Sequence, residues 1–136
     1  MEISDALAFV RQHHHAVLAT LKADGTPQLT PVTASVDADG HVVVSSRETA
    51  YKTRNLRRDP RAWLSVFTDG FYGEWVQLAG TVEVVSLPDA MEGLVDYYRS
   101  VSGEHPDWDD YRAAMVRDQR CLLTITLEQA GPTRQG

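Results

Sequence analysis

The chain has 136 residues, of which 43% are hydrophobic and 24% are charged, and this predicts one folded domain over residues 1–136. Its formal net charge is −6, which argues against general nucleic-acid binding because that function needs broad positive charge. The one cysteine, Cys121, excludes an intrachain disulfide framework and a multi-cysteine zinc site, and it fits a reducing compartment.

Neither membrane insertion nor export is predicted. No apolar run approaches the roughly 18 residues of a membrane span. The first residues, "MEISDALAFVRQHHH", lack the basic-then-apolar order of a signal peptide. We therefore expect a cytoplasmic protein.

The first part of the chain predicts one helix and three strands. Ser4 is expected to cap a helix over residues 4–12, whose apolar positions form a stripe. Asp24 and Gly25 mark a hairpin turn, and Pro31 indicates an edge strand, a bulge or a place where the ladder opens for a ligand. The strands are expected over residues 15–21, 28–37 and 41–46.

The second part predicts three helices and three further strands. Thr49 is expected to cap a helix over residues 50–59 that ends before Pro60. Asp107, with Asp110 three residues on, resembles the capping box of another helix. The helices are expected over 87–101 and 106–118, and the strands over 62–68, 74–85 and 121–127.

The order of these elements predicts a mainly β fold. Six strands follow one another as hairpins, and the helices are inserted instead of alternating with the strands. This pattern favours a small antiparallel β-barrel with peripheral helices over a doubly wound parallel sheet.

The segment "YKTRNLRRDPRA", residues 51–62, is basic in an acidic protein. It carries about +4, which leaves −10 for the remainder. Its arginines follow at three- and four-residue spacings and are expected to share one helix face. Lys52 lies in the first turn, where free backbone N–H groups and the helix dipole favour a phosphate. The alternative is a solvated charged face; the preceding strand and cap favour the anion site.

The remaining polar motifs are interpreted structurally, and no metal site is predicted. Neighbouring residues of an extended chain point to opposite faces, so His13–His15 cannot form one tetrahedral site. Cys121 is expected to be a buried structural thiol. The aromatic loop "TDGFYGEW", residues 68–75, either lines a substrate pocket at a dimer interface or covers one end of the barrel.

Lys52, Leu56 and Pro60, at four-residue steps after the strand "HVVVSS", resemble the pyridoxamine 5′-phosphate oxidase-like split-barrel family. The stretches "VLATLKADGTPQLTPV", "KTRNLRRDPRA", "LAGT" and "YRSVSGEHPDWDDYRAAMVRDQRCLLT" resemble its actinobacterial branch of deazaflavin reductases, which use coenzyme F-420. The resemblance implies a six-stranded antiparallel split β-barrel of the FMN-binding type. It also implies a homodimer with the cofactor at the interface.

The resemblance further implies which residues contact the cofactor. Lys52 matches the lysine that grips the phosphate, Trp75 matches a residue reaching the cofactor from the fifth strand, and Arg57 is a candidate for the acidic tail. The strand at Pro31 matches the one whose backbone lies along the ring. The full set of implied cofactor-binding residues is Pro31, Val32, Thr33, Ala34, Ser45, Ser46, Tyr51, Lys52, Arg57 and Trp75.

Two departures argue against a vitamin B6 oxidase. Ala50 and Tyr51 stand where the oxidases have Ser and Arg before the lysine, and the ending "LEQAGPTRQG" lacks their basic C-terminal segment. The resemblance instead implies an F-420-dependent oxidoreductase that transfers a hydride to a small unsaturated or planar acceptor. The alternatives are an FMN-dependent oxidoreductase of the same fold and a non-catalytic carrier of F-420 or a tetrapyrrole. No catalytic residue is assigned, although Tyr51 and Tyr72 are candidate proton donors and water is a third.

Overall fold

The structure, a computed structural model, describes residues 1–70 and 72–132. Its helices are α1 (Ile3–Gln12), α2 (Tyr51–Arg58), α3 (Met91–Ser102) and α4 (Trp108–Arg117). Its strands are β1 (His15–Leu21), β2 (Pro27–Thr33), β3 (Ser35–Val36), β4 (Val42–Arg47), β5 (Arg61–Phe67), β6 (Trp75–Val85) and β7 (Arg120–Gly131).

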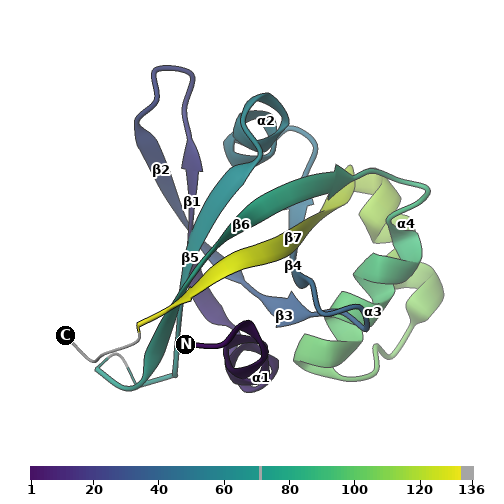
Figure 1. Cartoon of the computed structure of the whole chain (residues 1–136). Coiled ribbons are helices and arrows are strands. Elements are labelled where there is room, and N and C mark those ends of the chain that lie inside the picture. The colour runs from purple at the N-terminus through teal and green to yellow at the C-terminus, as the bar shows by residue number, and fades with distance from the viewer. Residues whose placement is uncertain (71, 133–136) are drawn as a thin grey trace.

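The strands form one curled antiparallel sheet (Figure 1), in the order β2-β1-β5-β6-β7-β4-β3. Its two edge strands, β2 and β3, are consecutive in the chain and are separated only by Ala34. The sheet therefore curls until its edges meet, which makes a split barrel. The predicted mainly β barrel with peripheral helices is confirmed.

The described residues contain seven strands where six were expected. The difference lies in the segment 28–37, which forms β2 and β3 instead of one strand. Ala34 interrupts the ladder, and its N–H donates to the carbonyl oxygen of His14 at 2.8 Å. Pro31 lies in β2, so its prediction of an edge strand is confirmed.

The main hydrophobic core lies inside the barrel and is closed at both ends by helices. Alternate strand residues such as Leu18, Leu64 and Leu123 point inward and are fully buried. Val10 of α1 and Leu56 of α2 join this core from opposite ends of the barrel, as the positions of the two helices in Figure 1 show.

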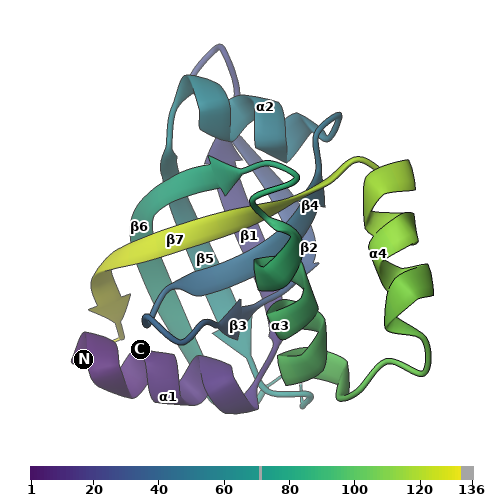
Figure 2. The ribbon, with the colours of Figure 1, turned by 90° about the vertical axis from the view of Figure 1, so that its right-hand side faces the viewer.

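A second hydrophobic cluster attaches α3 and α4 to the outside of the barrel (Figure 2). Val43 of β4 and Leu122 of β7 point outward and pack against Leu94, Val95 and Tyr111 of these helices. The opposite outer face, formed by β1, β2 and β5, is not covered by any helix of the described chain (Figure 1).

Two expected helix caps are wrong and one is confirmed. The N-cap of α1 is Glu2 instead of Ser4, and that of α2 is Ala50 instead of Thr49; neither helix has a side-chain cap hydrogen bond. The carboxylate of Asp107 does cap α4 by accepting the N–H of Asp110.

The helix expected over residues 87–101 begins only at Met91, after a turn. Among residues 1–70 and 72–132, no helix has both the length and the apolar character that a membrane span requires.

Candidate functional site: a cationic cavity beside the barrel seam

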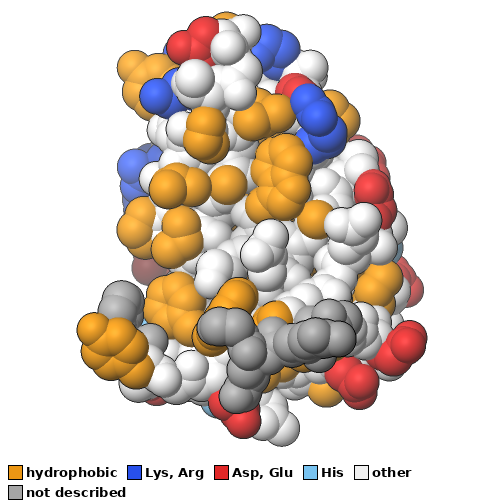
Figure 3. All heavy atoms as spheres, turned by 60° about the vertical axis from the view of Figure 1, so that its left-hand side comes forward, with side chains coloured by type: hydrophobic (Ala, Val, Ile, Leu, Met, Phe, Trp, Pro, Cys, Tyr) orange, Lys and Arg blue, Asp and Glu red, His pale blue; other side chains and the backbone are white. Residues whose placement is uncertain are grey.

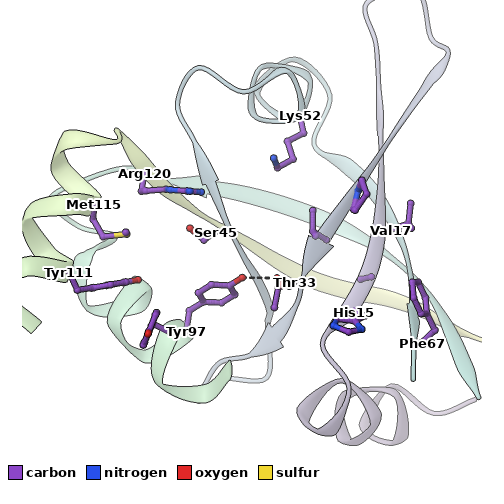
Figure 4. Close-up of a pocket in the computed structure, with 14 residues that line it drawn as sticks. His15, Val17, Thr33, Ser45, Lys52, Phe67, Tyr97, Tyr111, Met115 and Arg120 are labelled. Atoms are coloured by element: carbon purple, nitrogen blue, oxygen red, sulfur yellow. Dashed lines mark hydrogen bonds between the residues drawn. The ribbon is translucent and has the colours of Figure 1, made fainter. Parts of the chain in front are cut away.

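A cavity of about 850 Å³ lies where the first strands meet the C-terminal helices (Figure 4). One side is formed by β1, β2, β4, β5 and α2, and the other by α3, α4 and the first residue of β7. It borders the junction at Ala34, where the two sheet edges meet.

Five of the ten implied cofactor residues line this cavity. They come from three separate elements: the end of β2, the middle of β4 and the first turn of α2. The five are Pro31, Val32, Thr33, Ser45 and Lys52.

The other five lie outside this cavity. Ala34 and Ser46 are fully or almost fully buried, and the Ser46 hydroxyl is hydrogen-bonded to Thr53 at 2.8 Å. Tyr51, which is 71% exposed, and Arg57 lie elsewhere on α2.

Trp75, the last of these five, borders a second cavity of about 640 Å³ that also touches Tyr72 and Phe9. Residues 68–70 and 72–74 connect β5 to β6, and Tyr72, Gly73 and Glu74 of this connection line the second cavity. Phe71 of that loop lies outside the described residues.

The basic segment does not form one charged face. Arg61 lies beyond the helix, in β5, and pairs with Asp59 at 2.8 Å. Arg57 pairs with Glu48 at 2.6 Å, and Arg58 donates to a backbone carbonyl at the end of β1. The expectation of a shared face is wrong because α2 ends at Arg58.

Lys52 and Arg120 extend into the same end of the cavity, beside Ser45 (Figure 4). Neither side chain makes an ion pair or hydrogen bond with any described residue, and the Nε of Arg120 is buried without an acceptor. Burial lowers the pKa of the Lys52 amine, and the charges of Arg120 and Arg47 lower it further. A buried donor without a partner costs about 1–3 kcal/mol. This end of the cavity therefore fits an anion with several acceptor oxygens, such as a phosphate.

The position of Arg120 follows from the turn between α4 and β7. Gln119 has a φ of 53°, in the left-handed region, and its carbonyl accepts the N–H of Glu48 at 2.8 Å. The β4–β7 register then places Arg120 directly opposite Arg47. Like charges at such a pair of positions are unfavourable, so a negative charge beside Arg120 would be favourable.

The position of Lys52 follows from buried polar contacts beneath α2. The side-chain amide of Asn55 donates to Thr20 at 3.1 Å and to Gln28 at 2.8 Å, which attaches the helix to β1 and β2. Thr53 donates to the backbone carbonyl of Arg47 at 2.7 Å. These contacts leave the Lys52 side chain on the cavity side of the helix.

Tyrosines of α3 and α4 form the aromatic wall of the cavity. Tyr97 donates its hydroxyl hydrogen to the carbonyl oxygen of Thr33, and Tyr111 donates to that of Leu94, each at 2.8 Å. Burial raises the pKa of both hydroxyls, that of Tyr111 to about 12. Both side chains therefore stay neutral, and they offer apolar surface to a planar ligand.

Sequence reasoning missed this wall and Arg120. The residues concerned are Tyr97, Tyr98, Tyr111, Met115 and Arg120. One feature of the sequence could have identified Arg120. It is the first residue of an otherwise apolar strand and lies on the same face as Leu122, where a charge without a partner is unexpected.

The curled sheet and its helix-covered ends define a split β-barrel, and the cavity beside its seam has two cationic side chains at one end. Residues 4–133 match the family model described as pyridoxamine 5′-phosphate oxidase, and the chain belongs to this family. The family resemblance stated from the sequence is therefore confirmed.

The chain is also similar to named proteins. It is 36% identical over 126 residues to an F-420H2-dependent biliverdin reductase of Mycobacterium tuberculosis (strain CDC 1551 / Oshkosh), a match covering 92% of this chain and 83% of the relative.

Two solved structures are similar in fold. A conserved hypothetical protein of Mycobacterium tuberculosis has a TM-score of 0.78 at 26% identity, covering 96% of this chain and 82% of that one. A structure named F-420 reductase has a TM-score of 0.70 at 19% identity, covering 91% and 94% of the two chains. The latter identity supports the fold alone.

Proposed function

We propose that this protein is a reductase that uses coenzyme F-420 and reduces a small unsaturated or planar organic acceptor. The observation that carries the proposal is the pair Lys52 and Arg120, two cationic side chains at one end of a large cavity that have no counter-ion among residues 1–70 and 72–132. The similarity to an F-420H2-dependent biliverdin reductase supports the choice of cofactor.

The residues present fit an anionic deazaflavin. Lys52, Arg120 and the Ser45 hydroxyl would hold its phosphate, and the backbone from Pro31 to Thr33 would lie along its ring. When bound, the reduced cofactor supplies the hydride. The chain binds, orients and shields the reactants, and the tyrosine wall suits a flat acceptor. Biliverdin is the first acceptor to test, because the relative is named for it.

As part of this proposal, two copies of the chain associate through the uncovered face of β1, β2 and β5. Figure 3 shows hydrophobic side chains gathered on this side of the molecule. A shallow hollow there of about 300 Å³ is lined by Val17, Leu29 and Trp63 among others, and Leu29 is 66% exposed. Exposed apolar patches of this kind mark interaction surfaces. Val17 borders both this hollow and the large cavity, so a partner on this face would lie beside the cavity. We further propose a cytoplasmic location.

The test is a titration with oxidised F-420, and in parallel with FMN, that follows quenching of tryptophan fluorescence. The reporters are Trp63, Trp75 and Trp108. We expect saturable quenching by F-420 and a Kd about 10- to 100-fold higher in Lys52→Ala and Arg120→Ala, the loss expected when a charged hydrogen bond is removed. The matched control is Arg117→Ala, which removes an exposed arginine of α4 that pairs with Asp118.

Other results of the titration would favour a different function or contradict the site. Saturable quenching by FMN without any by F-420 would identify an FMN-dependent oxidoreductase. Binding of F-420 without oxidation of its reduced form by any acceptor in a panel would identify a carrier. Unchanged affinity in Lys52→Ala and Arg120→Ala would contradict the proposed site.

A further inference from the structure

The three adjacent histidines have three different surroundings. The ring of His13 lies against Phe9 with centroids 4.6 Å apart, and the Nδ1 of His14 is hydrogen-bonded to the carbonyl oxygen of Ala34 at 2.8 Å. His15 alone lines the large cavity, and its Nδ1 lies 3.1 Å from a carboxylate oxygen of Asp69.

His15 lies across the cavity from the cationic pair. As the first residue of β1, it points outward from the barrel and stands opposite Thr33 of β2 and Phe67 of β5. Figure 4 shows His15 and Phe67 together on one side of the cavity and Lys52 and Arg120 on the other. A phosphate at the cationic end would therefore leave the His15 end for the ring and the acceptor.

Four other polar side chains of the cavity, those of Tyr97, Tyr111, Lys52 and Arg120, are poorly placed to give a proton to an acceptor. Tyr97 and Tyr111 already donate their hydroxyl hydrogens to backbone carbonyls. Lys52 and Arg120 lie at the anion end. The candidates named from the sequence, Tyr51 and Tyr72, do not line this cavity.

We propose that His15 is a catalytic residue that gives its Nε2 proton to the acceptor, and that Asp69 is a positioning residue that orients the imidazole. The proposal rests on the proposed function. Nδ1 faces the Asp69 carboxylate, which favours the ring orientation that turns Nε2 away from Asp69; the two side chains are 62% and 94% exposed. A carboxylate that orients a histidine in this way is a recurring device in acid–base catalysis.

The atoms and electrons of the step balance. Reduced F-420 is the reductant, and one hydride with its two electrons passes to the acceptor, which gains one bond to hydrogen and one negative charge. The N–H bond at Nε2 of the His15 imidazolium then breaks, and the proton forms the second new bond to hydrogen on the acceptor. His15 would be left neutral and would regain a proton from water, which balances the proton that the cofactor would release to water on oxidation.

The activity test compares His15→Gln with His13→Gln, a histidine of the same segment that lies outside the cavity. With reduced F-420 and biliverdin as the probe acceptor, we expect kcat to fall about 100-fold in His15→Gln, within the usual range of general acid catalysis. The Kd for F-420 should change less than twofold. Asp69→Asn should lower kcat without raising KM, and its matched control is Asp39→Asn in the β3–β4 turn.

The pH profile gives a further readout. The groups facing His15 are Thr33 from β2, Phe67 from β5 and Asp69 from the following loop, and within the described residues Asp69 is its one ionic contact. The pH dependence of kcat should differ between the wild-type enzyme and His15→Gln, because only the wild-type enzyme carries the proposed proton donor. A His15→Gln enzyme with the wild-type kcat and pH profile would overturn the assignment.

The position of His15 beside the cofactor can also be tested without turnover, and therefore without knowing the acceptor. NMR signals of the His15 ring, assigned by their loss in His15→Gln, should shift when oxidised F-420 is added, and those of His13 should not. Unchanged His15 signals with F-420 bound would overturn the assignment and leave the proposed function intact. Absence of F-420 binding to the wild-type protein would instead overturn the proposed function.

Discussion

The hydroxyl of Tyr97 on α3 donates a hydrogen bond to the carbonyl oxygen of Thr33 at the end of β2, over 2.8 Å. Three residues further along α3, Ser100 is hydrogen-bonded to Ser35 of β3, also at 2.8 Å. One helix thus holds both sides of the junction at Ala34, and it also forms the aromatic wall of the cavity.

Replacing Tyr97 by Phe tests this link. The Thr33 carbonyl would lose its side-chain donor, and we expect the free energy of unfolding to fall by about 1 kcal/mol or somewhat more. Urea denaturation measures the change. The matched control is Tyr98→Phe, since the Tyr98 hydroxyl makes no hydrogen bond with the described residues, and its stability should match the wild type. Equal stability of the two variants would show that the bond contributes nothing.

Replacing Gly80 by Ala should destabilise the barrel. Gly80 lies at the irregularity between β6 and β7, and an added Cβ would press on the carbonyl oxygen of Thr126, a backbone atom that cannot rotate away. We expect a loss of about 1–3 kcal/mol, as for other overpacked sites. Thermal unfolding measures it. Gly70→Ala is the control, because the nearest atom to its added Cβ lies at 4.0 Å; a similar loss there would refute the explanation.

The affinity for F-420 should fall at alkaline pH. Burial and neighbouring arginines hold the pKa of Lys52 below 10.5 in the free protein, and a bound phosphate would raise it. The complex therefore keeps the Lys52 proton more tightly than the free protein does. The Kd should be constant below the free pKa of Lys52 and should rise above it. Fluorescence titrations between about pH 7 and pH 10.5 follow the change.

The control for this pH dependence is Lys52→Arg, because arginine stays charged throughout the range. This variant should bind with a weaker pH dependence than the wild type. An equally steep rise of Kd in both proteins would assign the titration to another group.

Replacing Leu29 by Lys tests the proposed subunit interface. Leu29 is 66% exposed on the uncovered sheet face, and a charge buried there between two subunits would be costly. We expect a dimer of the wild-type protein and a monomer of the variant in sedimentation velocity. Val116→Lys is the control, since Val116 is 61% exposed on α4, a helix that packs against β4 and β7 instead of the uncovered face. A dimer that persists in Leu29→Lys would place the interface elsewhere.

Much of the fold could be predicted from local patterns. Alternation of apolar residues predicted the strands, and the Asp107 cap and Pro31 edge strand follow from the chemistry of those residues. The break at Ala34 was missed because nothing in the local sequence interrupts the alternation over 28–37. It results from the closure of the sheet, which is a tertiary effect.

Cavity residues could be predicted from the sequence only where they belong to one contiguous motif. The Lys52 helix and the end of β2 were identified from contiguous motifs, and they do line the cavity. Arg120 and the tyrosine wall come from the last third of the chain and reach the cavity through the β4–β7 register and the packing of α3. The interpretation of Arg57 and Arg61 as part of one charged face overlooked Glu48 and Asp59, the acids that pair with them.

The separation of Lys52 and Arg120 along the chain has a consequence for the lifetime of the protein. An anion held by both would join the helix after β4 to the first residue of the last strand, much as a cross-link does. A ligand at 100 times its Kd adds about 2.7 kcal/mol to the free energy of unfolding. Cells short of the cofactor would therefore hold a less stable form of this protein, and proteases would remove it sooner.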